Sequence, residues 1–203
     1  MPTRETPTSV LYDGFHQRFY GAVPGENSVY VLAEADGSIQ AKITIPSAFA
    51  LDLSVDGTRL YVTSSPTILG GGGAQGYFVV DTTTLRLVDF VQPGELGATL
   101  TNPGLPSPYL EDNVPRFIAV LSDGTVAYVA EHTDSTGGSI FINQPSTNLA
   151  SWLFALDFYA GPIVKSRDGS TFVSVSGSSS DDVLSLYDTA SASIKANLTL
   201  TST

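Results

Sequence analysis

The chain has 203 residues, of which 42% are hydrophobic and 14% charged, so it is long enough to bury a core and too apolar to be disordered. Its nine basic and twenty acidic side chains give a net charge of −11, which repels polyphosphate backbones and argues against nucleic-acid binding. It has no cysteine, which excludes disulfides, thiolate metal sites and cysteine nucleophiles, and no apolar run reaches the roughly 18–20 residues that span a bilayer.

The chain begins with MPTRETPTSV, a stretch without the hydrophobic core of a signal peptide. The sequence therefore predicts either a cytosolic protein or one whose export signal lies outside this chain. The nineteen glycines and twelve prolines that punctuate it favour turns and short strands over long helices.

Predicted strand pairs repeat four times along the chain. Three repeats open with an alternating run, then Asp-Gly, then a run rich in aromatic and β-branched residues, which predicts a hairpin whose tight turn has positive φ at both central residues. The copy at 10–23 is degenerate, with an extra residue or two around the turn. A second strand pair follows each hairpin. The hairpins are expected at 10–23, 51–64, 118–131 and 162–176, and the second pairs at 28–45, 76–91, 139–156 and 182–200.

Each repeat is thus four antiparallel strands over about 40–45 residues, the size of one blade of a β-propeller. The predicted fold class is all-β: a single propeller domain, 1–203, of about four blades. The Pro- and Gly-rich stretch 92–115 is expected to be an insertion loop between the second and third blades. The blades are placed at approximately 7–46, 47–91, 116–159 and 160–203.

The second repeat is similar to the YVTN-type β-propeller repeat, a family that includes lactonase-like and surface-layer propellers. The family pattern is roughly Ser-Pro-Asp-Gly-x-x-x-Tyr-Val-Thr-Asn, followed by a strand that ends in Asp-Thr. Residues 54–63 and 78–84 carry it best, and Ser64 stands where the family usually has Asn. The resemblance implies a propeller blade and, because such repeats occur in cell-envelope proteins, an extracellular or envelope location.

Most propellers of this family have seven blades, so four blades predict a partial ring. Three interpretations remain: a fragment of a larger propeller, half of a ring closed by dimerisation, and a true four-bladed ring. The fragment is favoured, and self-association through the open terminal blades is expected because unpaired sheets are prone to pair.

The stretch ILGGGGAQGYFVV contains Gly71, Gly73 and Gly76 in the spacing of a dinucleotide-binding loop. Such a loop needs a helix after it to bind the pyrophosphate, but YFVVD is β-branched and aromatic. We therefore interpret the stretch as a long loop between the second and third strands of a blade, and no cofactor is predicted.

Loops between second and third strands are expected on the same face as the connections between blades, and loops on a rigid scaffold often carry function. Polar side chains gather in these loops, and His132 is a candidate general base or ligand. No motif of a catalytic, cofactor or metal site occurs. The candidate binding face is Glu111, Asp112, Asn113, Glu131, His132, Asp134, Asp181 and Asp182.

The leading functional hypothesis is a non-catalytic propeller segment that acts as a rigid scaffold for a protein or small-molecule ligand. The resemblance also implies an alternative, a lactonase-like hydrolase that acts on a sugar lactone. A third hypothesis, single-stranded DNA binding, conflicts with the net charge of −11.

Overall fold

The computed structural model describes residues 5–64, 76–92, 114–131, 137–144, 149–157, 159–177, 181–191 and 193–201. Within them the chain forms sixteen β-strands and one short 3-10 helix, η1 (Pro24–Glu26), and no α-helix. This confirms the all-β prediction. Gly71 and Gly73 lie outside the described residues. So do residues 93–113, which are most of the expected insertion loop.

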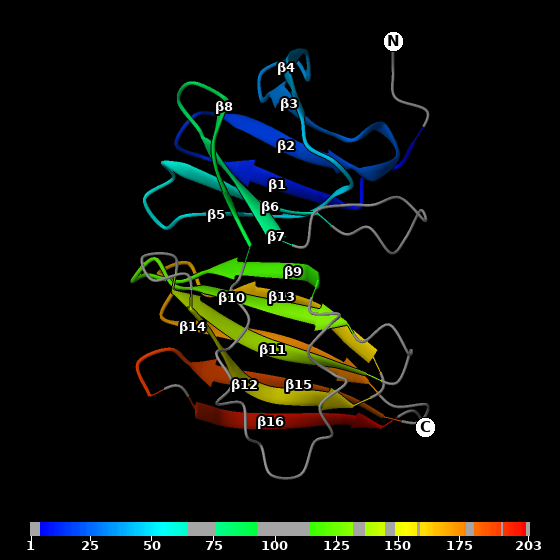
Figure 1. The fold of residues 1–203 in the computed structure, drawn as a ribbon, viewed down its shortest axis with the longest axis vertical. Helices are drawn as coiled ribbons and strands as arrows, with labels where there is room; N and C mark the ends of the chain where they lie inside the picture. The colour runs from blue at the N-terminus through cyan, green and yellow to red at the C-terminus, as the bar shows by residue number, and fades with distance from the viewer. Residues whose placement is uncertain are drawn as a thin grey trace. The chain divides into compact units, whose positions relative to one another are not determined.

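The strands form four antiparallel sheets of four strands, each in chain order (Figure 1). Four sheets of four antiparallel strands agree with the predicted fold class, and each sheet is called a blade below. The first blade is β1 (Ser9–Asp13), β2 (Arg18–Val23), β3 (Ser28–Ala33) and β4 (Ile39–Thr44); the second is β5 (Ala48–Leu53), β6 (Arg59–Ser64), β7 (Gly76–Asp81) and β8 (Arg86–Val91). The third is β9 (Val114–Val120), β10 (Val126–Glu131), β11 (Gly137–Gln144) and β12 (Leu149–Asp157); the fourth is β13 (Tyr159–Lys165), β14 (Thr171–Gly177), β15 (Asp181–Asp188) and β16 (Ser193–Thr201).

The chain divides into two compact units, Met1–Gln92 with the first two blades and Pro93–Thr203 with the last two. In the first unit β5 packs against β1 and β2. Alternate residues of each strand point to one face, so the two blades meet through apolar faces. The core of this unit contains Tyr20, Ala22, Val29, Val31 and Ile43 of the first blade and Leu51, Leu53, Leu60, Val62, Phe78 and Val80 of the second.

The second unit repeats this arrangement, with β13 packed against β9, β10 and β11. Its core joins Ala119, Ala127, Val129 and Ile140 of the third blade to Ile163, Phe172 and Tyr187 of the fourth. The aromatic rings of Phe172 and Tyr187 stack with centroids 4.8 Å apart. Pairwise packing of blades therefore supplies the core in both units.

The Asp-Gly hairpins are present, but their turns differ from the predicted geometry. In the turns of the second, third and fourth blades only the glycine has positive φ: 71° at Gly57, 82° at Gly124 and 68° at Gly169. In the first-blade hairpin it is Gln17, with φ of 53°, and not Gly14. The main-chain N–H of Gly57 donates to the carbonyl oxygen of Ser54, 2.9 Å away, and that of Gly169 donates likewise to Ser166. The loops are thus longer than a two-residue primed turn, and the preceding aspartate keeps an ordinary conformation.

The third blade has a shorter first turn than its neighbours. Val120 pairs with Val126, enclosing five residues, whereas in the second blade Leu53 pairs with Leu60, enclosing six. Because successive side chains of a strand point to opposite faces of the sheet, a turn shorter by one residue exchanges the faces on which the residues after the Asp-Gly pair lie. Accordingly Ala127 joins the core shared with the fourth blade, and Tyr128 packs with Ala130 and Phe141 in a separate cluster.

Gly76, the last glycine of the dinucleotide-like stretch, opens β7 and confirms that a strand follows the loop. A Cβ there would lie 2.4 Å from the carbonyl oxygen of Val91 and 2.8 Å from the ring of Phe90. Glycine is therefore required because β8 approaches closely, which is a packing role.

Candidate functional site

The strand pairings bring the predicted loop positions of the second unit to one end of its two blades. Gly138 pairs with Glu131, and Gly137 pairs with Asp157 at the end of β12. Two residues after Asp157, Tyr159 pairs with Gly177, which in turn pairs with Asp182. We call this end, where β10, β12 and β14 finish and β11, β13 and β15 begin, the loop end.

Of the candidate binding residues, Asp182 is exposed at the start of β15. The backbones of Glu131 and Asp181 lie at the loop end, at the finish of β10 and the start of β15. The pairings therefore bring these three positions to one end of the unit. The other candidates, Glu111, Asp112, Asn113, His132 and Asp134, lie outside the described residues.

The loop end of the first unit is tied together by Asn27. This residue has a left-handed conformation, with φ of 51°, and it follows η1. Its carbonyl oxygen accepts a hydrogen bond from Ile45 N at 2.9 Å, and its Oδ1 accepts one from Ser47 N at 2.8 Å. The side chain thus joins the β2–β3 loop to the connection that enters the second blade, which is a structural role.

A carboxylate cluster lies beside this loop on the first blade. Glu26 Oε2 accepts hydrogen bonds from the hydroxyl of Tyr30 and from Lys42 Nζ, the latter at 3.0 Å. The Lys42 ammonium also lies 5.1 Å from the centroid of the Tyr30 ring. These hydrogen bonds, from Tyr30 first, hold the pKa of Glu26 below its usual value, so this carboxylate is engaged within the blade.

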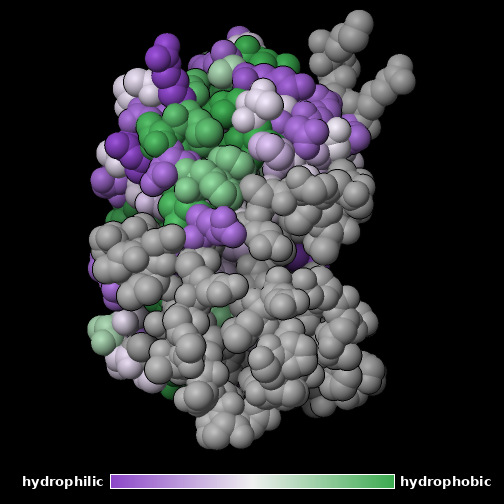
Figure 2. Space-filling view, viewed as in Figure 1, coloured by the Kyte–Doolittle hydropathy of each residue, from purple (hydrophilic) through white to green (hydrophobic). Residues whose placement is uncertain are grey.

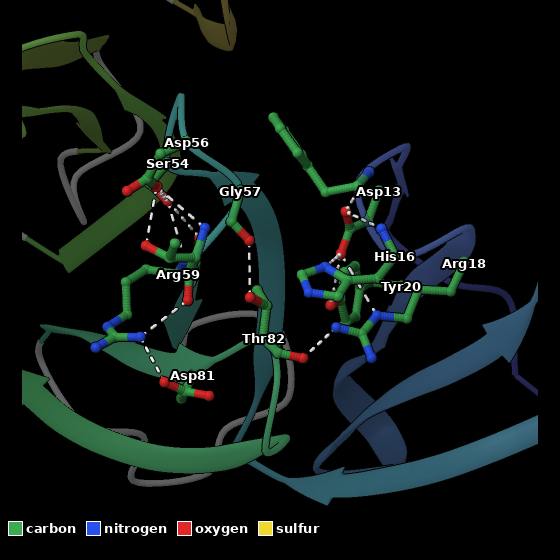
Figure 3. Close-up of polar contacts among 12 residues, drawn as sticks. Asp13, His16, Arg18, Tyr20, Ser54, Asp56, Gly57, Arg59, Asp81 and Thr82 are labelled. Carbon is green, nitrogen blue, oxygen red and sulfur yellow. Dashed lines mark hydrogen bonds and ion pairs between the residues drawn. The ribbon is translucent and has the colours of Figure 1, made fainter.

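At the opposite end, the turn end, the structure contains a buried polar network around Asp13 (Figure 3). Asp13 Oδ1 accepts from the main-chain N–H groups of Phe15 and His16 at 3.0 and 3.1 Å. Its Oδ2 lies 2.8 Å from His16 Nδ1, 3.1 Å from the hydroxyl of Tyr20 and 3.4 Å from Arg18 Nε. Five donors therefore converge on one carboxylate.

The environment of Asp13 favours its charged form. Burial alone raises the pKa of the carboxyl, but hydrogen bonds from His16 and Tyr20 outweigh this effect and leave the pKa below its usual value. Burial is also the main reason why the pKa of Tyr20 is raised. Some enzymes use a carboxylate that is hydrogen-bonded to an imidazole. Here, however, the oxygen that contacts the His16 imidazole, Asp13 Oδ2, is also bound by Arg18 and Tyr20. The network is a structural ion cluster.

Arg18 extends the network to the second blade. Its Nη2 donates to the carbonyl oxygen of Thr82, in the turn after β7. Thr82 Oγ1 in turn donates to the carbonyl oxygen of Gly57 at 2.7 Å (Figure 3). At the turn end of the first unit, the hydrogen bond from Arg18 to Thr82 thus connects the first blade to the second.

Smaller clusters close the Asp-Gly turns. Asp56 Oδ1 accepts from Ser54 Oγ at 2.6 Å and from the N–H and Oγ1 of Thr58 at 3.0 and 2.9 Å. Asp168 makes the same bonds with Ser166 and Ser170, which lower its pKa to about 2, with the Ser166 hydroxyl the largest cause. The polar side chains of the turn end therefore satisfy one another.

Within the described ranges, no group of three or more His, Asp or Glu side chains is arranged to hold a metal ion. In the same part of the chain, no helix is long and apolar enough to cross a membrane.

The sequence did not predict the Asp13 network, of which His16 is a member. The structure places its side chain partly buried, with 30% exposure, against the buried Asp13. One signal was available, because Arg18 and Tyr20 alternate on β2 and so share the face that Asp13 meets across the hairpin.

Comparison with known proteins supports the fold. No family model matches the chain. No curated protein matches it either. Among solved structures, it is similar to hydrazine synthase of Kuenenia stuttgartiensis, with a TM-score of 0.68 and 14% identity over 99% of this chain and 52% of that one. It is also similar to the WD40 repeats of RRP9, with a TM-score of 0.64 and 10% identity over 99% of this chain and 52% of that one. A third similar structure is the Dos1 propeller, with a TM-score of 0.63 and 17% identity over 97% of this chain and 47% of that one.

The chain thus spans about half the length of the solved structures it matches. At these identities the likeness shows the fold alone, and the YVTN-type family remains a prediction from residues 54–63 and 78–84. The four sheets of four strands have a β-propeller fold.

Proposed function

We propose that the chain is a non-catalytic β-propeller segment that acts as a rigid platform for recognising a protein or small-molecule ligand. The observation that carries this proposal is the contrast between the two ends of the blades. At the turn end, polar side chains such as Asp13, Asp56 and Asp168 are occupied by local hydrogen bonds. At the loop end of the first unit Glu26 and Asn27 are also engaged within the chain, so recognition is assigned to the loop end of the second unit, where Asp182 is exposed.

Connection lengths also favour the loop end over the turn end. At the turn end β5 and β6 are separated only by 54–58, whereas at the loop end β6 finishes at Ser64 and β7 begins at Gly76. Long loops on a rigid sheet are the usual place for binding residues. The candidates Glu111, Asp112, Asn113, Glu131, His132, Asp134, Asp181 and Asp182 remain our proposed binding face.

A pair of photo-crosslinking positions tests the proposal. A photoreactive amino acid replaces Asp182 at the loop end of the fourth blade or Asp168 at its turn end, both of which are exposed. In lysate of the source cells, the loop-end probe should form one discrete adduct that the turn-end probe does not form. Equal labelling from both positions, or none from Asp182, would contradict the proposal.

The lactonase alternative needs its own test because His132, its best candidate base, lies outside the described residues. We expect no hydrolysis of glucono-δ-lactone above the buffer rate, with or without added Ca²⁺ or Zn²⁺. Turnover that His132→Ala removes would replace the scaffold proposal with the enzyme. For single-stranded DNA, a fluorescent oligonucleotide should show no polarisation change at low salt.

We also propose that the chain self-associates through its terminal blades. Figure 2 shows hydrophobic side chains on the surface of the first unit. Large exposed hydrophobic residues on the first and fourth blades include Val10, Tyr12, Ile39, Val164 and Leu198, and the second blade exposes Leu87 and Val88 on β8. Grouped apolar surface of this kind is typical of an interaction site. An envelope location, implied by the YVTN resemblance, belongs to the same proposal.

A further inference from the structure

The first blade has one covered face and one open face. Tyr20, Val29 and Val31 are buried in the core shared with the second blade. The opposite face carries Tyr12 and Phe19, which pair across the hairpin with ring centroids 5.0 Å apart. On that face Val10 is 65% exposed, Tyr12 46%, Phe19 37% and Ile39 51%.

The second blade shows what normally covers that face. The ladder between β2 and β3 begins with Arg18 opposite Ala33, and the ladder between β6 and β7 begins with Arg59 opposite Asp81. Phe19 therefore corresponds to Leu60, and Tyr12, which pairs with Phe19, corresponds to Leu53. Leu53 and Leu60 are buried against the first blade. The open face is thus built to receive a preceding blade.

The fourth blade is open on the other side. Ile163, Phe172 and Tyr187 face the third blade. The opposite face is aliphatic and runs across all four strands, because Val164 pairs with Val173 and Leu184 pairs with Leu198. Val164 is 65% exposed and Leu198 56%. In the first blade the corresponding face is covered by the blade that follows.

From these two faces we infer that the fourth blade of one copy packs on the first blade of a second copy, head to tail. This inference rests on the proposed self-association and names the surfaces that make it. The contact would repeat the junction that each unit already forms between an earlier and a later blade. The chain covers 52% and 47% of two solved propeller-like chains, and two copies supply eight blades, within the usual range of four to eight.

Two charge substitutions and a control test which faces meet. Val10→Glu blocks the first-blade face and Leu198→Glu blocks the fourth-blade face. Ile194→Glu is the control, because Ile194 lies on the same strand as Leu198, is 46% exposed and pairs with Tyr187 of the opposite face. Light scattering measures the mass, and circular dichroism checks that each variant keeps its sheet content.

The unchanged chain and Ile194→Glu should have at least twice the 21.3 kDa mass of one copy. Each blocked variant alone should be a monomer, with self-association at least tenfold weaker, because an unpaired charge would be buried in the junction. Mixing the two blocked variants should restore a dimer, since one intact face remains on each.

Each other result overturns part of the proposal. A dimer formed by Leu198→Glu alone means that two first blades meet, and one formed by Val10→Glu alone means that two fourth blades meet. Either result rejects the head-to-tail contact but keeps self-association. A monomeric unchanged chain rejects both the head-to-tail contact and self-association.

Discussion

Arg18 and Thr82 are joined across the junction of the first two blades, because Nη2 of the guanidinium donates to the carbonyl oxygen of a residue 64 positions later in the chain. The same guanidinium lies against the buried carboxylate of Asp13. One side chain therefore connects the charge cluster of one blade to the outer turn of the next. Its removal affects both.

Arg18→Ala should destabilise the chain by about 3–5 kcal/mol, because it leaves a buried carboxylate without its cation. Arg59→Ala is the matched control: Arg59 also begins a second strand, but its ion pair with Asp81 has side-chain exposures of 41% and 22%. Its loss should cost about 0–1 kcal/mol. Urea unfolding followed by circular dichroism measures both, and similar losses would contradict the structural role of Arg18.

Acid should weaken the fold partly through Asp13. Its pKa in the folded chain lies below the usual 3.8, so its contribution is complete above that value and is lost as pH falls through the lowered pKa. Asp13→Asn should therefore show a shallower loss of unfolding free energy between about pH 5 and pH 2 than the unchanged chain. Urea unfolding at several pH values measures the slope, and an equal slope would show that Asp13 does not contribute.

Gly57 and Gly124 both have positive φ, but they differ in the space available for a Cβ, so alanine substitutions there distinguish backbone strain from steric conflict. A Cβ on Gly57 would lie 2.2 Å from the ring of Phe15, whereas nothing lies within 4 Å of one on Gly124. Both have positive φ, so Gly124→Ala should cost about 1–2 kcal/mol from conformation alone. Gly57→Ala should cost more than this, because the Phe15 ring, which is 66% exposed, must move aside. Adding Phe15→Ala to Gly57→Ala should recover part of that difference in thermal unfolding.

Two threonines make the same hydrogen bond at different depths. Thr82 Oγ1 donates to Gly57 O at 2.7 Å and is buried, and Thr189 Oγ1 donates to Ser170 O at 2.7 Å and is more exposed. Thr82→Val should cost about 1–3 kcal/mol, since the Gly57 carbonyl loses a buried donor. Thr189→Val should cost less, because water replaces the hydroxyl. Equal costs in urea unfolding would mean that burial does not set the strength of this bond.

The strand content was predictable because it depends on local patterns. Asp-Gly between alternating runs marked three hairpins, and the strand expected at YFVVD after Gly76 is present as β7. The turn geometry was wrong, because the Ser54 and Thr58 side chains bind Asp56 and stabilise a longer loop. Side-chain hydrogen bonds of this kind compete with the two-residue turn that the dipeptide favours.

The face of the sheet on which a side chain lies, and the contacts between blades, were harder to predict from the sequence. Tyr61 and Tyr128 stand at the same distance after their Asp-Gly glycines, but the turn before Tyr128 is shorter by one residue. Tyr128 is buried with Ala130 and Phe141, whereas Tyr61 is partly buried and its ring lies 5.9 Å from that of Tyr77. The Arg18–Thr82 contact depends on which blades are neighbours, which no local pattern encodes. For the candidate binding face, only the position of strand ends could be predicted, and the structure describes Asp182 there as exposed.

The hydrogen bonds of Asn27 determine where the chain can be interrupted. Ile45 and Ser47 are held by this one residue, and Pro46 O accepts from Ser64 Oγ at 2.6 Å. Gly37, in contrast, is exposed, with nothing within 4 Å of a Cβ there. A foreign peptide or new chain termini should therefore be tolerated at Gly37 and rejected at 45–47, so the smallest portable module is a pair of blades.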